Sequence, residues 1–254
     1  MVLCLDVGNT NIKFGLFKGE ELKHSWRMHS DILKTADDYG INVTSFFNRV
    51  GLDLHTVNGI IISSVVPAIN YTLEHMCKLY FDIVPIFVGP GVKTGLNIRY
   101  DDAKDLGADR IVNSVAAFER FGGPLIVMDV GTALTFNVIS QKGEFLGGAI
   151  CPGIRIAMKS LATNTAQLPN VELIKPETAI GRSTTGCIQS GFFYGYVGMV
   201  DNMIEKLRQE VLGDVKIVAT GGLVNLIADE CKEHIEIDPV LTLTGLKMIY
   251  DKNN

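Results

Sequence analysis

Two short acidic turns carry the residues of this chain that are best suited to phosphate chemistry. The first is Asp6-Val7-Gly8-Asn9-Thr10-Asn11, and the second is Asp129-Val130-Gly131-Thr132. A glycine lets main-chain N–H groups converge on an anion, and the asparagine and threonine side chains add donors. A carboxylate repels phosphate, so Asp6 needs a cation or a water molecule beside it, and Lys13 can bring positive charge. An ordinary hairpin turn is the alternative for each motif alone.

A third motif, Gly107-Ala108-Asp109-Arg110, places an acid beside a base at the predicted start of a helix over residues 108–120. In a functional interpretation, Asp109 accepts a proton from an alcohol and Arg110 holds an anionic or carbonyl group. In a structural interpretation, both are ordinary charges near a helix terminus. The residues alone leave the two interpretations equally open.

Other common nucleotide and metal motifs do not fit. Residues 89–94 read Gly-Pro-Gly-Val-Lys-Thr, with Val92 where a P-loop has the glycine before its lysine, and their spacing also misses the dinucleotide fingerprint. The five histidines are dispersed without metal-ligand spacing. Gly221-Gly222 follows a predicted strand, and it either admits a flat ring close to the backbone or forms a turn into a helix.

Composition narrows the class of protein further. The 254 residues are 47% hydrophobic and 20% charged, which excludes a disordered chain, and the net charge of −5 argues against nucleic acid as the main partner. No apolar run approaches the roughly 20 residues that span a bilayer. The start of the chain lacks a signal peptide's basic region, and five scattered cysteines favour reduced thiols. We therefore expect a cytoplasmic globular protein with no membrane or nucleic-acid partner.

Strand patterns alternate with helix patterns along the chain. Apolar and β-branched runs predict strands over residues 2–7, 12–17, 22–28, 58–66, 83–88, 125–130, 134–139 and 215–220. Helical spacing predicts helices over residues 37–50, 71–81 and 108–120. A glycine-rich helical run over residues 186–198 contains four aromatic side chains, which suit either the core or a subunit interface.

The pattern begins again halfway along the chain. Asp6-Val7-Gly8 recurs as Asp129-Val130-Gly131 at an offset of 123 residues, and Lys18-Gly19-Glu20 recurs as Lys142-Gly143-Glu144 at an offset of 124. A single-residue slip would relate the two blocks of strands and turns. We expect two duplicated α/β halves, residues 1–117 and 118–254, facing each other across a cleft that holds the ligands.

These motifs together resemble the type III pantothenate kinases, a family of the acetate and sugar kinase, heat-shock chaperone and actin superfamily. The resemblance covers nearly the whole chain. It rests on both acidic turns, on Gly107-Ala108-Asp109-Arg110, on Pro152-Gly153, on residues 191–198 and on Gly221-Gly222. It implies two ribonuclease-H-like (actin-like ATPase) halves with mixed five-stranded sheets flanked by helices. It also implies phosphorylation of pantothenate by ATP to 4′-phosphopantothenate, the first step of coenzyme A biosynthesis.

The resemblance also implies roles for individual residues. Asp109 is the catalytic proton acceptor, and Asp129 binds a monovalent cation, K⁺ or NH₄⁺. Asp6 is the carboxylate near the Mg²⁺ that accompanies ATP. Thr184 contacts the substrate of the partner subunit, which implies a homodimer. The ATP phosphates contact Asp6, Val7, Gly8, Asn9, Thr10, Asn11, Ile12, Lys13 and Thr132, and pantothenate contacts Tyr100, Gly107, Ala108, Asp109 and Arg110.

Two other functions remain open on the residues alone. One is another small-molecule kinase of the superfamily, acting on a sugar or on acetate. The other is a regulatory or chaperone-like module that only opens and closes on ATP, although relatives of that kind carry inserted subdomains for which 254 residues leave no room.

Overall fold

The computed structural model describes residues 1–254, and these form two compact units. The first unit comprises residues 1–96, 101–116 and 240–254. The second comprises residues 97–100 and 117–239. None of the helices combines the length and the apolar character that a bilayer crossing requires.

The first unit is built on a five-stranded mixed sheet in the order β3-β2-β1-β4-β5. β1 pairs antiparallel with β2, β2 antiparallel with β3, and β4 parallel with both β1 and β5. All six residues of β1 are buried, as expected for a central strand covered on both faces. The strands are β1 (Val2–Val7), β2 (Asn11–Lys18), β3 (Glu21–His29), β4 (Gly59–Ser64) and β5 (Ile86–Phe87).

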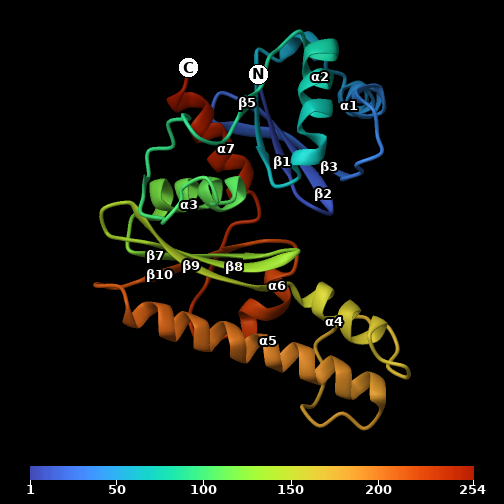
Figure 1. Cartoon of the computed structure of the whole chain (residues 1–254), viewed down its shortest axis with the longest axis vertical. Helices are drawn as coiled ribbons and strands as arrows, with labels where there is room; N and C mark the ends of the chain where they lie inside the picture. Colours follow the sequence, from blue (N-terminus) through green and yellow to red (C-terminus); the bar gives the residue numbers. More distant parts are fainter. The chain divides into compact units, whose positions relative to one another are not determined.

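Helices cover both faces of this sheet. α1 (Ala36–Arg49) and α2 (Asn70–Phe81) pack against each other, and their apolar residues share one core with β1, β2 and β4. Thr35 begins α1 with a capping box, because its side chain accepts from the Asp38 N–H while the Asp38 side chain accepts from the Thr35 N–H. α7 (Leu241–Lys252) packs against β1, β2 and β4, and α3 (Ala108–Phe121) begins in this unit (Figure 1).

The second unit is built on a six-stranded sheet in the order β11-β10-β7-β8-β9-β6. β7 pairs antiparallel with β8 and parallel with β10, and β8 pairs antiparallel with β9. The long helix α5 (Thr184–Gln209) runs along this sheet (Figure 1), and its buried residues share a core with β7, β8 and β10. The strands are β6 (Asn97–Ile98), β7 (Leu125–Val130), β8 (Ala133–Ile139), β9 (Glu144–Pro152), β10 (Lys216–Thr220) and β11 (Glu236–Ile237), and the other helices are α4 (Ile154–Thr163) and α6 (Val224–Ile227).

The two sheets have the same topology, which confirms the predicted duplication. β1, β2, β3, β4 and β5 correspond in order and direction to β7, β8, β9, β10 and β11. The second sheet has six strands where the sequence predicts five, because residues 97–98 join its edge by pairing with β9.

The single-residue slip inferred from the sequence is wrong. Val7 pairs with Ile12, whereas Val130 pairs with Leu134, so the first turn is one residue shorter in the second half. At the other end of these strands Val2 pairs with Phe17, and Leu125 pairs with Ile139. The Lys-Gly-Glu turn follows Phe17 directly but begins three residues after Ile139, so this second turn is longer in the second half. The shorter first turn and the longer second turn nearly cancel, so the sequence shows a net difference of only one residue.

Two further predictions differ from the structure. The strand expected over residues 83–88 is reduced to β5 at Ile86–Phe87, because only Ile61 and Ile62 of β4 pair with it. The sequence also assigns residues 240–254 to the C-terminal half, whereas α7 packs within the first unit. The reason is close packing: Tyr250 lies directly over Gly59 of β4, where any Cβ would be 1.8 Å from its hydroxyl.

Candidate functional site

The first acidic turn closes the hairpin between β1 and β2. The Gly8 N–H donates to the Asn11 carbonyl over 3.1 Å, and Asn9, Thr10 and Asn11 are exposed. The φ angle of Gly8 is not positive, so the turn does not use the left-handed conformation that glycine permits. Space at this position is restricted, because a Cβ there would lie 3.3 Å from the Asn11 carbonyl oxygen.

A charge pair lies directly below this turn. Asp6 and Lys13 are cross-strand neighbours in the β1–β2 hairpin, and the Lys13 Nζ lies 3.3 Å from the Asp6 Oδ2. Asp6 is 8% exposed, so its carboxylate is largely removed from water. A partly buried carboxylate that already has one cationic partner is suited to hold a second cation, or a water molecule bound to one, at its free side.

Asp109 lies in the first turn of α3, in the same unit as Asp6. Its Oδ1 accepts from the Arg110 N–H over 2.8 Å, and it lies 2.6 Å from where a Cβ on Gly107 would be, so only glycine leaves room for this conformation. Burial raises the pKa of the Asp109 carboxyl, and repulsion from Asp6 raises it further. A raised pKa makes a carboxylate a better proton acceptor.

The second acidic turn closes the hairpin between β7 and β8. Within this turn the Gly131 N–H donates to the Ala133 carbonyl over 3.0 Å. Closely packed glycines surround it. A Cβ on Gly153 would lie 2.2 Å from the Thr132 carbonyl oxygen, and a Cβ on Gly221 would lie 2.5 Å from the Val130 carbonyl oxygen. Gly221 also has a φ of 107°, which disfavours any side chain.

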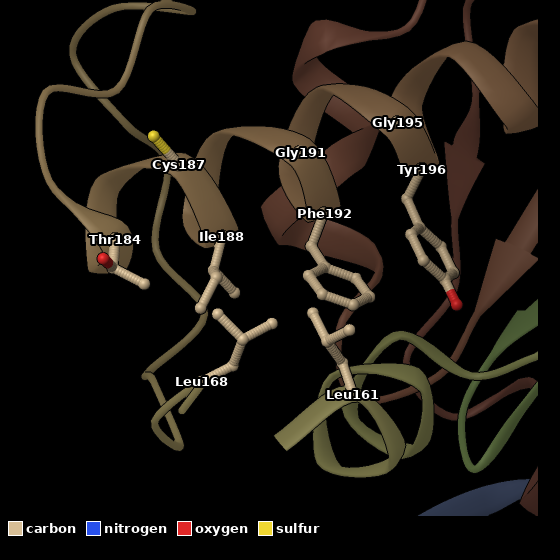
Figure 2. A pocket seen from close by; sticks show the side chains of 9 residues that line it. All are labelled: Leu161, Leu168, Thr184, Cys187, Ile188, Gly191, Phe192, Gly195 and Tyr196. Carbon is tan, nitrogen blue, oxygen red and sulfur yellow. The ribbon is translucent and has the colours of Figure 1, made fainter. Parts of the chain in front are cut away.

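The remaining predicted residues lie on the second unit. Tyr100 follows β6, and its ring packs edge-on against Phe145 of β9 at a centroid distance of 6.0 Å. Thr184 is exposed in the first turn of α5 and lines an apolar groove, together with other α5 residues and two leucines from outside the helix (Figure 2). The groove residues are Leu161, Leu168, Thr184, Cys187, Ile188, Gly191, Phe192, Gly195 and Tyr196.

The first unit thus brings Asp6, Lys13 and Asp109 together, and the second places Asp129 and Thr132 on one hairpin. Sequence reasoning missed Ser30, whose hydroxyl donates to the Gly8 carbonyl over 2.5 Å from 22 residues away. No motif signals this contact, because a serine after a strand is common.

A Mg²⁺ ion that arrives with ATP needs few ligands from a protein, because phosphates and water supply most of them. No group of three or more histidine, cysteine, aspartate or glutamate side chains could hold a metal ion alone. Mg²⁺ keeps several of its waters and binds through one or two carboxylates plus substrate phosphates, and Asp6 offers such a single carboxylate. Asp129 offers another at the second turn.

Comparison with known proteins assigns the family. The family model for type III pantothenate kinases matches residues 2–206. Type III pantothenate kinases of Geobacillus sp. (strain WCH70) and Geobacillus kaustophilus are 48% and 47% identical over 253 residues, covering 100% of this chain and 98% of each relative. The ethanolamine utilization protein EutJ from Carboxydothermus hydrogenoformans shares the fold, with a TM-score of 0.58 at 14% identity over 97% of this chain and 89% of that one.

The matched region contains both acidic turns and the whole of the Gly107–Arg110 motif, and the two relatives extend the match over the full chain. Together with the duplicated actin-like architecture, these findings place the chain in the type III pantothenate kinase family.

Proposed function

We propose that this chain transfers the γ-phosphoryl group of ATP to the primary hydroxyl of pantothenate, with Asp109 as the general base. The family membership supports the reaction, which forms 4′-phosphopantothenate and opens coenzyme A biosynthesis. The observation that carries the role of Asp109 is its place in the first turn of α3 near Asp6, where burial and the charge of Asp6 raise the pKa of its carboxyl. The carboxylate orients the hydroxyl and accepts its proton as the phosphoryl group transfers.

The two acidic turns bind the ATP phosphates. In the first turn the donors are the main-chain N–H groups and the side chains of residues 8–11, with Lys13 adding positive charge beside Asp6. In the second turn Thr132 contributes. Mg²⁺ would accompany ATP and offset the charge of its phosphates, and Asp6 would help to hold it, because a single carboxylate suits an ion held mainly by phosphates and water. Phosphoryl transfer asks for position and charge more than for covalent help from the protein.

Pantothenate binds beside the start of α3. Gly107 and Ala108 bring the backbone close to the substrate, Arg110 holds an anionic or carbonyl group, and Tyr100 lines the pocket. Arg110 is 6% exposed, so its guanidinium is a fixed charge with little freedom to reorient. A fixed planar guanidinium suits the carboxylate of pantothenate.

A monovalent cation, K⁺ or NH₄⁺, binds at Asp129. Asp129 supplies one carboxylate to a hairpin against which glycines pack closely. A monovalent cation needs no more than one carboxylate, because main-chain carbonyl oxygens can provide its other ligands. Such a cation would offset negative charge on the nucleotide. Replacing K⁺ by Na⁺ is expected to lower activity, and Asp129→Asn should remove that difference.

The active form is a homodimer that pairs through α5. The groove residues of α5 recur three and four positions apart along one helix face, and the groove has a volume of about 430 Å³. An isologous contact would cover this face on both subunits and bring Thr184 to the partner's substrate. Sedimentation should then show a species near twice 27.7 kDa, and Phe192→Asp should give an inactive monomer. An active wild-type monomer would contradict this assembly.

The reaction is tested by coupled ADP release with and without pantothenate, with the product identified by its mass. We expect turnover that depends on pantothenate and is at least tenfold slower with sugars or acetate. Faster turnover of a sugar or of acetate would overturn the substrate assignment. ADP release that is indifferent to any acceptor would indicate an ATPase instead.

A further inference from the structure

Ser30 makes two hydrogen bonds to the first acidic turn, here called the phosphate turn (residues 8–11). Its hydroxyl donates to the Gly8 carbonyl over 2.5 Å, and its N–H donates to the Thr10 carbonyl over 3.0 Å. Ser30 is 9% exposed and directly follows β3, whose last residue, His29, pairs with Asn11. One buried residue therefore binds the turn at two of its carbonyl groups.

These two contacts determine where the donors of the turn point. In a planar trans peptide the C=O and the N–H point in opposite directions. Because the Gly8 carbonyl points to Ser30, the N–H of Asn9 points away from it, and the Thr10 carbonyl orients the Asn11 N–H in the same manner. Ser30 thus fixes the direction of two N–H groups of the turn, and backbone N–H groups held in this way can bind an anion.

Ser30 is itself held by the core. The next residue, Asp31, donates its N–H to the Tyr39 hydroxyl over 3.1 Å, and that hydroxyl donates to the Asp31 carbonyl over 2.8 Å. Tyr39 belongs to α1 and is completely buried within the core of the first unit. A continuous series of contacts therefore leads from the core through Tyr39 and Asp31 to Ser30 and the turn.

We propose that Ser30 is a positioning residue for ATP, holding the phosphate turn in its binding conformation while Tyr39 anchors it. The proposal rests on the proposed function, because it assumes that residues 8–11 bind the nucleotide phosphates. Ser30 has no part in binding pantothenate or in proton transfer. Its loss should weaken ATP binding and leave the other steps unchanged.

The variant Ser30→Ala tests this, with Ser30→Thr as the conservative variant and the exposed Ser45→Ala on α1 as the matched control. Losing one buried hydrogen bond is expected to raise both the KM for ATP and the Kd for the non-hydrolysable analogue AMP-PNP about 5- to 20-fold. The KM for pantothenate and the pH profile of kcat should stay within about twofold. Ser30→Thr should recover most of the affinity, and Ser45→Ala should match the wild type.

Tyr39→Phe provides a second variant, because it removes only the hydroxyl contact to Asp31 and should raise the Kd for AMP-PNP by a smaller factor. Folding of each variant is checked by circular dichroism, and Tyr39→Phe decides the result if Ser30→Ala does not fold. An unchanged AMP-PNP affinity, or an equal rise in both KM values, would overturn the role of Ser30. Failure of the proposed function is distinguishable, since the wild type would then release no ADP in response to pantothenate.

Discussion

The two acidic turns occupy equivalent places in the two halves but differ in their surroundings. Asp6 has Lys13 across its hairpin and Asp109 close enough to repel it, so the first turn is surrounded by charge. At the second turn the residues paired with Asp129 are Thr135 of β8 and Thr220 of β10, and glycines pack closely against the hairpin. The difference indicates that the two halves diverged after duplication, with charged side chains gathered at the first turn and close glycine packing at the second.

The largest expected effect comes from removing the carboxylate of Asp109, which lies near the first turn. Asp109→Asn should lower kcat by about 10²–10⁴, because the substitution removes the proposed base while retaining the shape of the side chain. Steady-state ADP release measures the change. Asp105→Asn, the same substitution at an exposed position four residues earlier, is the control and should remain active.

Substituting Asp6 and Asp129 should affect different properties of the enzyme, namely the rate at saturating Mg²⁺ and ATP and the response to K⁺. Asp6→Asn is expected to lower kcat about 10- to 100-fold at saturating Mg²⁺ and ATP, because we propose that Asp6 acts beside the reacting phosphates. Asp129→Asn should lower activity less and abolish its response to K⁺. Titrations of activity with Mg²⁺ and with K⁺ separate the two. A K⁺ response that survives in Asp129→Asn would place the cation elsewhere.

Glycine-to-alanine substitutions test whether the second turn is more closely packed than the first. Gly153→Ala should destabilise the second unit by about 1–3 kcal/mol, because its Cβ would meet the Thr132 carbonyl oxygen at 2.2 Å. Gly8→Ala should cost less, since its nearest contact is 3.3 Å away. Thermal melting measures both, with Gly89→Ala as a control that meets no atom within 4 Å. Equal losses at Gly8 and Gly153 would remove the contrast between the turns.

The raised pKa of Asp109 predicts the sign of two pH effects. The Asp109 carboxylate is protonated at a higher pH than usual, so kcat should fall as the pH drops through this raised pKa. Asp6→Asn removes the repulsion that helps to raise the pKa of Asp109, so the fall in kcat should move to lower pH. The folded state also binds this proton more tightly than the unfolded state, so its contribution to stability declines as the pH rises. The melting temperature of Asp109→Asn should therefore exceed that of the wild type by a margin that grows with pH.

Much of the fold could be predicted because its signals are local. The strands ending at Val7 and Val130 are continuous apolar runs, and the recurring turns revealed the duplication. What could not be predicted depends on contacts between distant residues. α7 joins the first unit because Tyr250 fits over Gly59, and β5 is short because only two residues of β4 pair with it.

The candidate site divides in the same way. Asp6, Asp109 and Asp129 lie in recognisable motifs, so their types and spacing were sufficient to propose roles for them. Ser30 and Tyr39 lie in no motif, and their importance depends on hydrogen bonds that only the folded chain creates. The sequence could not separate backbone freedom from close packing as the reason for glycine at position 8, because both favour the same residue.

The most direct test of the central claim compares kcat with the Kd for AMP-PNP in Asp109→Asn. If Asp109 acts on the hydroxyl proton and the turns hold the nucleotide, kcat should fall by about 10² or more while the Kd stays within about twofold of the wild type. A folded Asp109→Asn variant that phosphorylates pantothenate at a near-normal rate would contradict the account.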